Sequence, residues 1–426
     1  MQRDDGHAAT WTRDRVLFAA AELLFVIATL AMLSSGANIL VGCSGEGRRA
    51  AAPGDAGARA PSDARAQAAW GAPDAGSPDA GSSDAGSRDA GSSDAGSSDA
   101  GSRDAGVRVR RTGRFFQHAD APIRTALANQ AIASVERGRG GRSLSFRVTL
   151  EDGTAGYFKP EQSFSGMKWY SEVAAYHLDR ELGLGRVAPV VSRRVAWSEL
   201  EEAAQGDPRV SEIAVDDEGF VRGAMIWWVP SRPTVLPLEA GWEGWLRIDG
   251  VVPRVTPYQP ADDYRRGVEI TPPEALPDPD LPARPAELSD LMVFDYLIHN
   301  GDRWGTSNVN VRTLGPGGPL MFLDNAAGFA MRRPRVGQMD ARLEHVQRFR
   351  RSTIDAIRAF DVERYRKRLG EEALGPILDD VLVRHLMTRR AHLLAHVDAL
   401  VAQHGAEAVY FDETPATTIA DADPRD

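Results

Sequence analysis

The sequence predicts an α+β fold in which a mainly antiparallel sheet precedes a helical half, and two observations support this. First, residues 144–150 alternate apolar and polar side chains, which is the period of a half-buried strand, and Asp152-Gly153 then marks a hairpin turn. Second, residues 288–298 and 377–404 have the apolar spacing of helices. A run of strands followed by a run of helices is typical of this fold class.

Residues 1–43 have the pattern of an export signal or a membrane anchor. Residues 16–33 are almost wholly apolar, interrupted by Glu22, and three arginines precede them. The only cysteine of the chain, Cys43, follows Leu40-Val41-Gly42, which resembles a bacterial lipobox. We therefore expect a lipoprotein of the cell envelope, anchored to the membrane at Cys43, with its globular part outside the cytoplasmic membrane. An uncleaved signal anchor and a cytosolic protein with a misread start are the alternatives.

Composition excludes several classes of site and partner. A single cysteine rules out an intrachain disulfide and a Cys-rich zinc site. The formal net charge of -10 gives no electrostatic support for a nucleic-acid partner. Within residues 44–112, Asp-Ala-Gly-Ser recurs with a period of five residues, and no apolar side chain larger than alanine recurs with it. Such a repeat cannot bury a core, so we predict a disordered acidic linker there and a disordered tail at residues 411–426.

A lysine and a glutamate in the strand-rich half have the layout of a nucleotide-positioning ion pair. Lys159 ends the return strand of the predicted hairpin, and Glu172 lies thirteen residues later in a predicted helix. In kinases this arrangement positions the nucleotide phosphates, although a solvated surface pair explains two isolated residues as well. Ahead of the hairpin, Gly140 and Gly141 lie in a flexible turn whose amides could approach phosphates; a tight turn explains these glycines equally well.

Two aspartates in the helical half extend this set of charged candidates. The buried helix at residues 288–298 leads into Asp302, and a short apolar strand at residues 320–323 leads into Asp324. A Gly-Pro turn separates the two, so both carboxylates can converge on one point. Phosphoryl transfer needs such a pair, because one carboxylate orients the attacking hydroxyl and the other holds the metal that bridges the phosphates. Taken alone, a solvated hairpin explains the two aspartates as well.

The ordered motifs resemble the secretory-pathway kinase family, which includes the Golgi casein kinase, the proteoglycan xylose kinase and the four-jointed kinase. The matching segments cover most of residues 132–360 and are IASVERGRGG, YFKP, SEVAAYHLDRELGLGRVAPV, LSDLMVFDYLIHNGDR, PGGPLMFLDNAAG and RFRRST. The resemblance implies a two-lobed protein-kinase-like fold with an antiparallel N-lobe sheet and one key helix at residues 113–235. A connection or insertion would follow at residues 236–287, and a helical C-lobe at residues 288–410.

The resemblance also implies roles for four charged residues. Lys159 would contact the nucleotide phosphates, and Glu172 would pair with Lys159 or help to hold the metal. Asp302 would be the catalytic base, and Asp324 the metal-binding aspartate. Together these roles imply ATP and Mg²⁺ or Mn²⁺ as the nucleotide and metal, and a protein or glycan hydroxyl as acceptor.

Two departures from the family pattern concern the loop after Asp302. The family commonly has Asp-Arg-His or a close variant where this chain has Trp304 in third position. The polar residue expected five positions after the base is Ser307, and Asn308 comes one residue later, so Asn308 is the candidate for the second metal ligand. These departures leave open a catalytically inactive surface binding module of the same fold. An enzyme of this fold that transfers AMP in place of phosphate is a third possibility.

Two further patterns have simpler explanations. His392 and His396 are spaced like a metal-binding pair on a predicted helix, but no third ligand is evident, so an amphipathic surface is expected. The tryptophan-rich segment at residues 225–230 is predicted to be a buried strand, which by analogy would line the adenine pocket.

Overall fold

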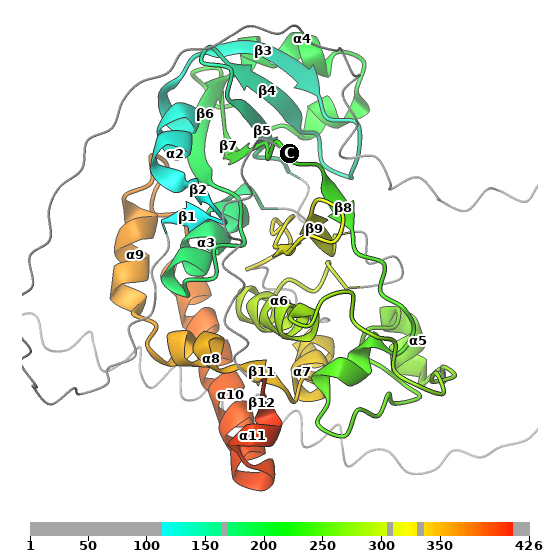
Figure 1. Ribbon diagram of the computed structural model, residues 1–426. Coiled ribbons are helices and arrows are strands. Elements are labelled where there is room, and N and C mark those ends of the chain that lie inside the picture. The colour runs from blue at the N-terminus through cyan, green and yellow to red at the C-terminus, as the bar shows by residue number, and fades with distance from the viewer. Residues whose placement is uncertain (1–112, 164–167, 305–309, 330–335, 412–426) are drawn as a thin grey trace, which may run out of the picture. The chain divides into compact units, whose positions relative to one another are not determined.

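The computed structural model describes residues 113–163, 168–304, 310–329 and 336–411, and Figure 1 shows how their helices and strands are arranged. The predicted export segment and linker lie outside these residues, and so does the predicted C-terminal tail except Phe411, which belongs to a strand. None of the described helices is long and apolar enough to cross a membrane.

A five-stranded antiparallel sheet forms the strand-rich half, in the order β3-β4-β5-β7-β6. Its strands are β3 (Ile132–Arg137), β4 (Phe146–Leu150), β5 (Ala155–Pro160), β6 (Val190–Ala196) and β7 (Phe220–Trp227). A short hairpin of β1 (Arg114–Phe115) and β2 (His118–Ala119) and the helix α2 (Asp120–Asn129) precede it. The small helix α4 (Glu201–Ala204) lies in the connection from β6 to β7.

The hairpin of β4 and β5 confirms the alternation predicted for this segment. Phe146, Val148 and Leu150 are buried on one face of β4, while the residues between them are partly exposed. Gly153 has a φ of +84°, which a glycine adopts without steric cost, and it allows the chain to reverse here. The reversal brings Lys159 onto the strand next to β7, where it pairs with Ala224.

Helix α3 (Trp169–Glu181) connects β5 to β6 and carries Glu172. It ends before Gly183 and Gly185, whose φ angles of +68° and +66° are left-handed, so the predicted stop signal is correct. In Figure 1 the helix lies beneath the sheet and beside α9.

The helical half follows, and it contains a small second sheet. The helices are α5 (Ala261–Arg266), α6 (Arg284–Ile298), α7 (Val336–His345), α8 (Arg351–Arg358), α9 (Val362–Gly370), α10 (Asp380–His404) and α11 (Ala406–Val409). Strands β8 (Pro233–Val235), β9 (Arg312–Leu314) and β10 (Leu320–Met321) form an antiparallel sheet, and β11 (Phe349–Arg350) pairs in parallel with β12 (Tyr410–Phe411). Helix α6 begins four residues before the predicted start, and β10 spans only the first half of the predicted strand 320–323.

Two hydrophobic cores support these halves. One core lies under the sheet and contains Phe146, Phe158 and Met225. The other contains the apolar residues of α6, α8, α9 and α10, and it also includes Val173, Ala174 and Leu178 of helix α3. Helix α3 therefore packs with the C-terminal helices, although it comes between two strands of the N-terminal sheet.

Candidate active site

Lys159 forms the centre of a charged cluster drawn from three separate elements. Its Nζ donates hydrogen bonds to Glu172 Oε1 and to Asp324 Oδ1, each at 2.7 Å. Strand β5 supplies the lysine, helix α3 the glutamate, and the segment after β10 the aspartate. The exposed fractions of the three side chains are 16% for Lys159, 5% for Glu172 and 34% for Asp324. The most open oxygen-bearing group is therefore Asp324, which faces the solvent side of the cluster.

The electrostatics of the cluster favour its charged state. Burial alone would lower the pKa of Lys159, but the charges of Asp324 and Glu172 outweigh it and raise the pKa above the ordinary value. Burial would raise the pKa of Asp324, but Lys159, with help from Arg303 and Asn310, holds the pKa below its usual range. The lysine is thus a permanent cation, and the aspartate a permanent anion, near neutral pH.

The backbone at Asp324 is held in an uncommon conformation. Its φ of +57° is left-handed, which aspartate tolerates better than most residues but which still needs support from its surroundings. Asn310 Nδ2 donates to Asp324 Oδ2 at 3.1 Å, and Asn300 Nδ2 donates to the Asp324 carbonyl at 3.2 Å. Asn300 is fully buried, and its Oδ1 accepts from the backbone N–H of Asp302 at 3.3 Å. One asparagine therefore joins the backbone of both candidate aspartates.

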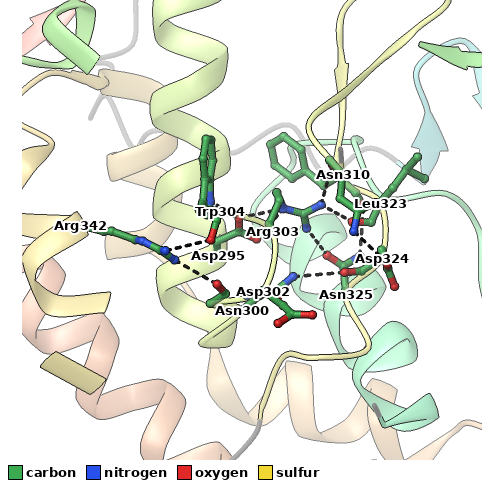
Figure 2. Close-up of polar contacts among 12 residues, drawn as sticks. Asp295, Asn300, Asp302, Arg303, Trp304, Asn310, Leu323, Asp324, Asn325 and Arg342 are labelled. Atoms are coloured by element: carbon green, nitrogen blue, oxygen red, sulfur yellow. Dashed lines mark hydrogen bonds and ion pairs between the residues drawn. The ribbon is translucent and has the colours of Figure 1, made fainter. Parts of the chain in front are cut away.

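Arg303 also contacts the segment that contains Asp324, as Figure 2 shows. Its side chain is fully buried and forms an ion pair with Asp295 of helix α6, with Nε to Oδ2 at 2.8 Å. The other guanidinium nitrogens donate to the carbonyl of Leu323 and to Asn325 Oδ1, the latter at 2.8 Å. Burial raises the pKa of Asp295, and Arg303 opposes this effect. The planar guanidinium thus connects α6 to the residues on both sides of Asp324.

Trp304, the departure from the family pattern, points into the core of the helical half. Only 3% of it is exposed, and its Nε1 donates to Asp295 Oδ2 at 2.7 Å. Its ring stacks on Trp242, with centroids 5.4 Å apart and planes inclined by 18°. Arg342 of helix α7 donates to the carbonyl of Trp304 at 3.0 Å and to that of Gly301 at 3.1 Å. Trp304 is therefore a buried hydrogen-bond donor that packs beneath the loop.

Asp302 differs from Asp324 in its exposure. It is exposed on the loop that follows α6, while its neighbours Arg303 and Trp304 are buried. The loop begins at His299, whose φ of +59° ends the helix in a left-handed turn. A carboxylate in this position is accessible to a second substrate.

Gly140 and Gly141 lie on the loop that joins β3 to β4. This loop lines a pocket of about 880 Å³ together with the arginines 137, 139, 142 and 209. None of the four charged candidates, Lys159, Glu172, Asp302 and Asp324, lines this pocket. The loop is connected to the β6–β7 segment, because Arg142 pairs with Glu212 at 2.7 Å.

The predicted second metal ligand, Asn308, lies outside the described residues, as does Ser307. Among the residues that the structure describes, no three His, Cys, Asp or Glu side chains are clustered closely enough to hold a metal ion by themselves. Asp324 and Glu172 do offer carboxylate oxygens, and Asn310 offers an amide next to Asp324. Oxygen donors of this type fit Mg²⁺ or Mn²⁺, which often take one or two carboxylates plus substrate phosphates.

Several residues of this site were missed from the sequence. Asn310 was not singled out, although its position two residues after Asn308 would place both on one face of an extended segment. Asn300 and Arg303 directly precede and follow the GD pair of the loop, but a sequence cannot show that their side chains turn back toward Asp324. Asp295 had no signal beyond being a charged residue in an apolar helix, which is a pattern that favours a buried partner.

The two helix histidines use their ring nitrogens within the protein. His392 Nδ1 lies 2.7 Å from the hydroxyl of Tyr296, and His396 Nε2 lies 2.9 Å from the carbonyl of Val346. His396 is partly buried, which a wholly solvent-facing histidine would not be. The pair therefore connects α10 to α6 and to the end of α7.

The chain is related in sequence to two kinds of curated protein. It is 30% identical over 242 residues to mouse four-jointed box protein 1, and the aligned segment covers 50% of this chain and 46% of that protein. It is 28% identical over 238 residues to human glycosaminoglycan xylosylkinase, with coverage of 48% and 55%. The chain thus spans about half the length of the curated relatives it matches. No protein-family model matches it.

Solved structures show the same fold at lower identity. Hydra Fam20 with sugar gives a TM-score of 0.52 at 21% identity, over 72% of this chain and 97% of that one. The Golgi casein kinase with Mn/ADP bound gives a TM-score of 0.51 at 18% identity, over 69% and 80%. The predicted two-lobed, kinase-like α+β fold is confirmed. The predicted resemblance is confirmed as well, since these relatives and structures are those of the secretory-pathway kinase family.

Proposed function

We propose that this protein is a metal-assisted, ATP-dependent phosphotransferase that acts on a protein or glycan hydroxyl. The observation that carries the proposal is Lys159, which lies 2.7 Å from both Glu172 and Asp324. A lysine held between a helix glutamate and a metal-loop aspartate is the arrangement on which kinases depend for phosphate positioning. Two of the proteins named above, the glycosaminoglycan xylosylkinase and the Golgi casein kinase, are kinases by name, which supports the same class of reaction.

In this mechanism the acceptor hydroxyl is oriented by Asp302. The acceptor oxygen forms a bond to the γ-phosphorus as the bond from that phosphorus to the β–γ bridging oxygen breaks, and ADP leaves. The proton of the hydroxyl passes to the Asp302 carboxylate, whose exposure leaves room for the acceptor. Lys159 binds and orients the phosphates that carry the transferred group. Asn300 keeps the two aspartate-bearing segments in register, because it bonds to the backbone of both.

A divalent cation fits the same residues. Asp324 would hold it, with Glu172 and an asparagine amide as further oxygen donors, and Asn308 remains our candidate for that amide. When bound, the cation would neutralise negative charge on the phosphates. The charge of the Lys159 cluster supports this, because one lysine and two carboxylates leave a net charge of -1.

Labelled ATP tests the proposal directly. The full chain would be incubated with Mn²⁺ and ATP labelled at either the α- or the γ-phosphate, with itself, casein and a β-xyloside as acceptors. We expect transfer of the γ label alone. Transfer of the α label would instead identify an AMP-transferring enzyme. Absence of both labels, together with no thermal stabilisation by Mn²⁺-ATP, would indicate an inactive binding module.

The Asp302→Asn variant separates chemistry from nucleotide binding. Removal of a general base lowers kcat by a factor of about 10²–10⁴. The Lys159 cluster, which is proposed to bind the nucleotide and the metal, keeps all three of its charges in this variant, so stabilisation by Mn²⁺-ATP should remain close to wild type. A variant that keeps wild-type kcat would contradict the assignment of Asp302 as base.

We further propose that the protein is anchored in the cell envelope at Cys43, with the lobes at residues 113–235 and 288–410 outside the cytoplasmic membrane. The apolar stretch and the lipobox-like sequence support this. Metabolic labelling with a palmitate analogue should modify the wild-type chain and leave a Cys43→Ser variant unlabelled. Equal labelling of the two chains would rule out lipidation at Cys43.

A further inference from the structure

Helix α3 is buried to a degree that its sequence does not suggest. Eleven of its thirteen residues are buried, including the charged or titratable side chains Glu172, His177, Asp179, Arg180 and Glu181. A surface helix normally keeps one polar face in water. Here every face of the helix is covered, and its apolar residues belong to the core of the C-terminal helices. The helix that carries Glu172 is therefore fixed from outside the sheet as well as by it.

Helix α9 supplies the cover on the outer face. The hydroxyl of Tyr365 donates to the Ala174 carbonyl at 3.0 Å, in the middle of α3. Arg364 pairs with Glu181 at 2.6 Å, and Arg368 pairs with the same glutamate at 2.8 Å. Tyr365 is fully buried, so its hydrogen bond is formed in the protein interior.

Glu372, two residues after α9, joins α3 to two further elements. Its carboxylate lies 2.7 Å from His177 Nε2 of α3 and forms an ion pair with Arg124 of α2. It also accepts from the backbone N–H of Ser192 in β6 at 2.9 Å and from its hydroxyl at 3.1 Å. Burial would raise the pKa of Glu372, but His177 and Arg124 reverse the effect and lower it. A buried carboxylate with this many donors is costly to disturb, because each donor would lose its partner.

The other end of α3 is bonded to the segment that follows Asp324. The backbone N–H of Lys168 donates to the Ala326 carbonyl at 2.7 Å, and Ser171 Oγ donates to the Gly328 carbonyl at 2.8 Å. Glu172 Oε1 itself accepts from the backbone N–H of Asn325 at 3.1 Å. The helix is thus held at its start by the candidate metal loop, and along its middle and end by residues 364–372.

We propose that residues 362–374, called here the clamp, hold α3 where Glu172 meets Lys159, so that the nucleotide site is assembled without a partner protein or a covalent modification. The inference rests on the proposed function. In kinases, formation of the lysine–glutamate pair is the step that helix movement controls. A helix covered on all faces and bonded at both ends has no alternative position of similar energy. Tyr365 and Glu372 act as positioning residues, since neither touches the proposed substrates.

Hydrogen–deuterium exchange on the full chain without nucleotide tests the clamp. In wild type we expect slow exchange at residues 169–181. Tyr365→Phe removes one buried hydrogen bond, and Glu372→Gln removes one charge, so both should raise exchange in that helix more than in α8 or α10. Lys367→Ala is the matched control, because Lys367 is on the same helix with 77% of its side chain exposed. Exchange in α3 that stays at the wild-type rate in both clamp variants would overturn the proposal.

Nucleotide binding provides an independent readout. If the clamp is weakened, only a fraction of molecules has α3 in place, and the apparent affinity for ATP falls by that fraction, about tenfold for a tenth of the molecules. We expect KM for ATP to rise in Glu372→Gln while kcat at saturating ATP is retained, because the bound nucleotide restores the ion pair. A fall in kcat alone would indicate a different role. Failure of the wild type to bind ATP would defeat the proposed function, whereas the exchange experiment would still decide the clamp.

Discussion

Helix α3 and the β3–β4 loop, residues 138–145, are two parts of the strand-rich half that differ in burial and in their contacts. The helix is buried on every face and bonded at both ends to the C-terminal half. The loop is less buried: three of its eight residues are exposed and three are partly exposed, and its outer contacts are with the β6–β7 segment, through Arg142 and Arg209. The residues whose separation must stay constant, Lys159 and Glu172, are on the buried scaffold.

The difference suggests a division of tasks. A positioning lysine needs partners that do not move, because a displacement of about 1 Å can cost two orders of magnitude in rate. A loop that closes over a substrate must instead open for each turnover, so exposed contacts with low individual stability suit it. Substitutions on the scaffold should therefore cost far more than substitutions on the loop.

The largest effect is expected for Asp324→Asn. The amide keeps the size of the side chain but removes the charge that Lys159 and the proposed cation share. We expect a loss of about 10³-fold in kcat/KM, which corresponds to roughly 4 kcal/mol of transition-state stabilisation. Thermal stabilisation by Mn²⁺-ATP should also disappear. If Asp324→Asn kept both activity and stabilisation, Asp324 would not be the metal-binding aspartate.

A loss of both stability and activity is expected for Arg303→Lys. Lysine keeps the charge but cannot make the bonds from one planar group to Asp295, Leu323 and Asn325. We expect a loss of about 2 kcal/mol in the free energy of unfolding, measured by urea denaturation, and a fall in kcat. Arg350→Lys is the control. Arg350 forms an ion pair with Asp290, with Nε and Oδ2 2.8 Å apart, and this pair lies outside the candidate active site. A similar loss of stability in both variants, with kcat lowered only in Arg303→Lys, is the expected pattern.

The stability of the helical half and that of the β6–β7 segment should depend differently on pH. Burial and then the charge of Arg247 lower the pKa of His345 to about 4, against about 6.5 when unfolded. A histidine with a lowered folded-state pKa contributes stability above pH 6.5, and this is lost as pH falls toward 4, by up to about 3 kcal/mol. In the β6–β7 segment, the hydrogen bond that Asp207 accepts from Arg209 lowers the pKa of Asp207 to about 2. The ion pair of Asp207 and Arg209 therefore persists between pH 6.5 and pH 4.

Chemical denaturation at pH 7.0 and pH 4.5 would measure this effect. The wild type should lose more stability between the two pH values than His345→Phe, which keeps an aromatic ring but cannot bind a proton. His345 also packs edge to face against Tyr258, with centroids 5.3 Å apart, and phenylalanine preserves that contact. Equal pH dependence in the two chains would show that His345 is not the source of acid sensitivity.

The smallest effect is expected for Gly141→Ala, and Gly153→Ala provides a close match. Both glycines have a left-handed φ, +85° and +84°, and an added Cβ would have nothing within 4 Å at either position. Each variant should therefore lose about 1 kcal/mol of stability from backbone strain alone. If the β3–β4 loop contacts nucleotide, only Gly141→Ala should raise KM for ATP. The expected rise is roughly threefold, which corresponds to less than 1 kcal/mol. The same KM in both variants would argue against nucleotide contact at Gly141.

The sequence predicted the sheet and the charged candidates because these depend on local patterns. Alternation at residues 144–150 and the Asp152-Gly153 turn specify the hairpin by sterics and burial alone. Lys159 and Asp324 could be located because each follows an apolar run with the pattern of a strand, although β5 and β10 belong to different sheets. Of the two contacts of Lys159, the sequence predicted the one with Glu172 but not the one with Asp324.

The surroundings of α3 could not be predicted. Its charged residues at positions 179, 180 and 181 indicate a solvated face, and nothing local shows that Asp120 pairs with Arg180 and that Arg364 pairs with Glu181. Trp304 was misleading for a similar reason, since its indole N–H donates to the buried Asp295 of α6, which the sequence does not show. Contacts between residues far apart in the chain depend on the whole fold, and a single sequence does not reveal them.

The placement of α3 has a consequence for how the chain folds. The predicted lobe boundary at residue 235 divides the sequence, but the core that contains α3 draws residues from both sides of it. A fragment that ends at residue 235 would leave Val173, Ala174 and Leu178 without the helices that cover them. We therefore expect the two lobes to unfold in one transition, seen as a single calorimetric peak, and the N-terminal fragment alone to aggregate. Contacts that align the catalytic residues would then also make the two halves dependent on each other for folding.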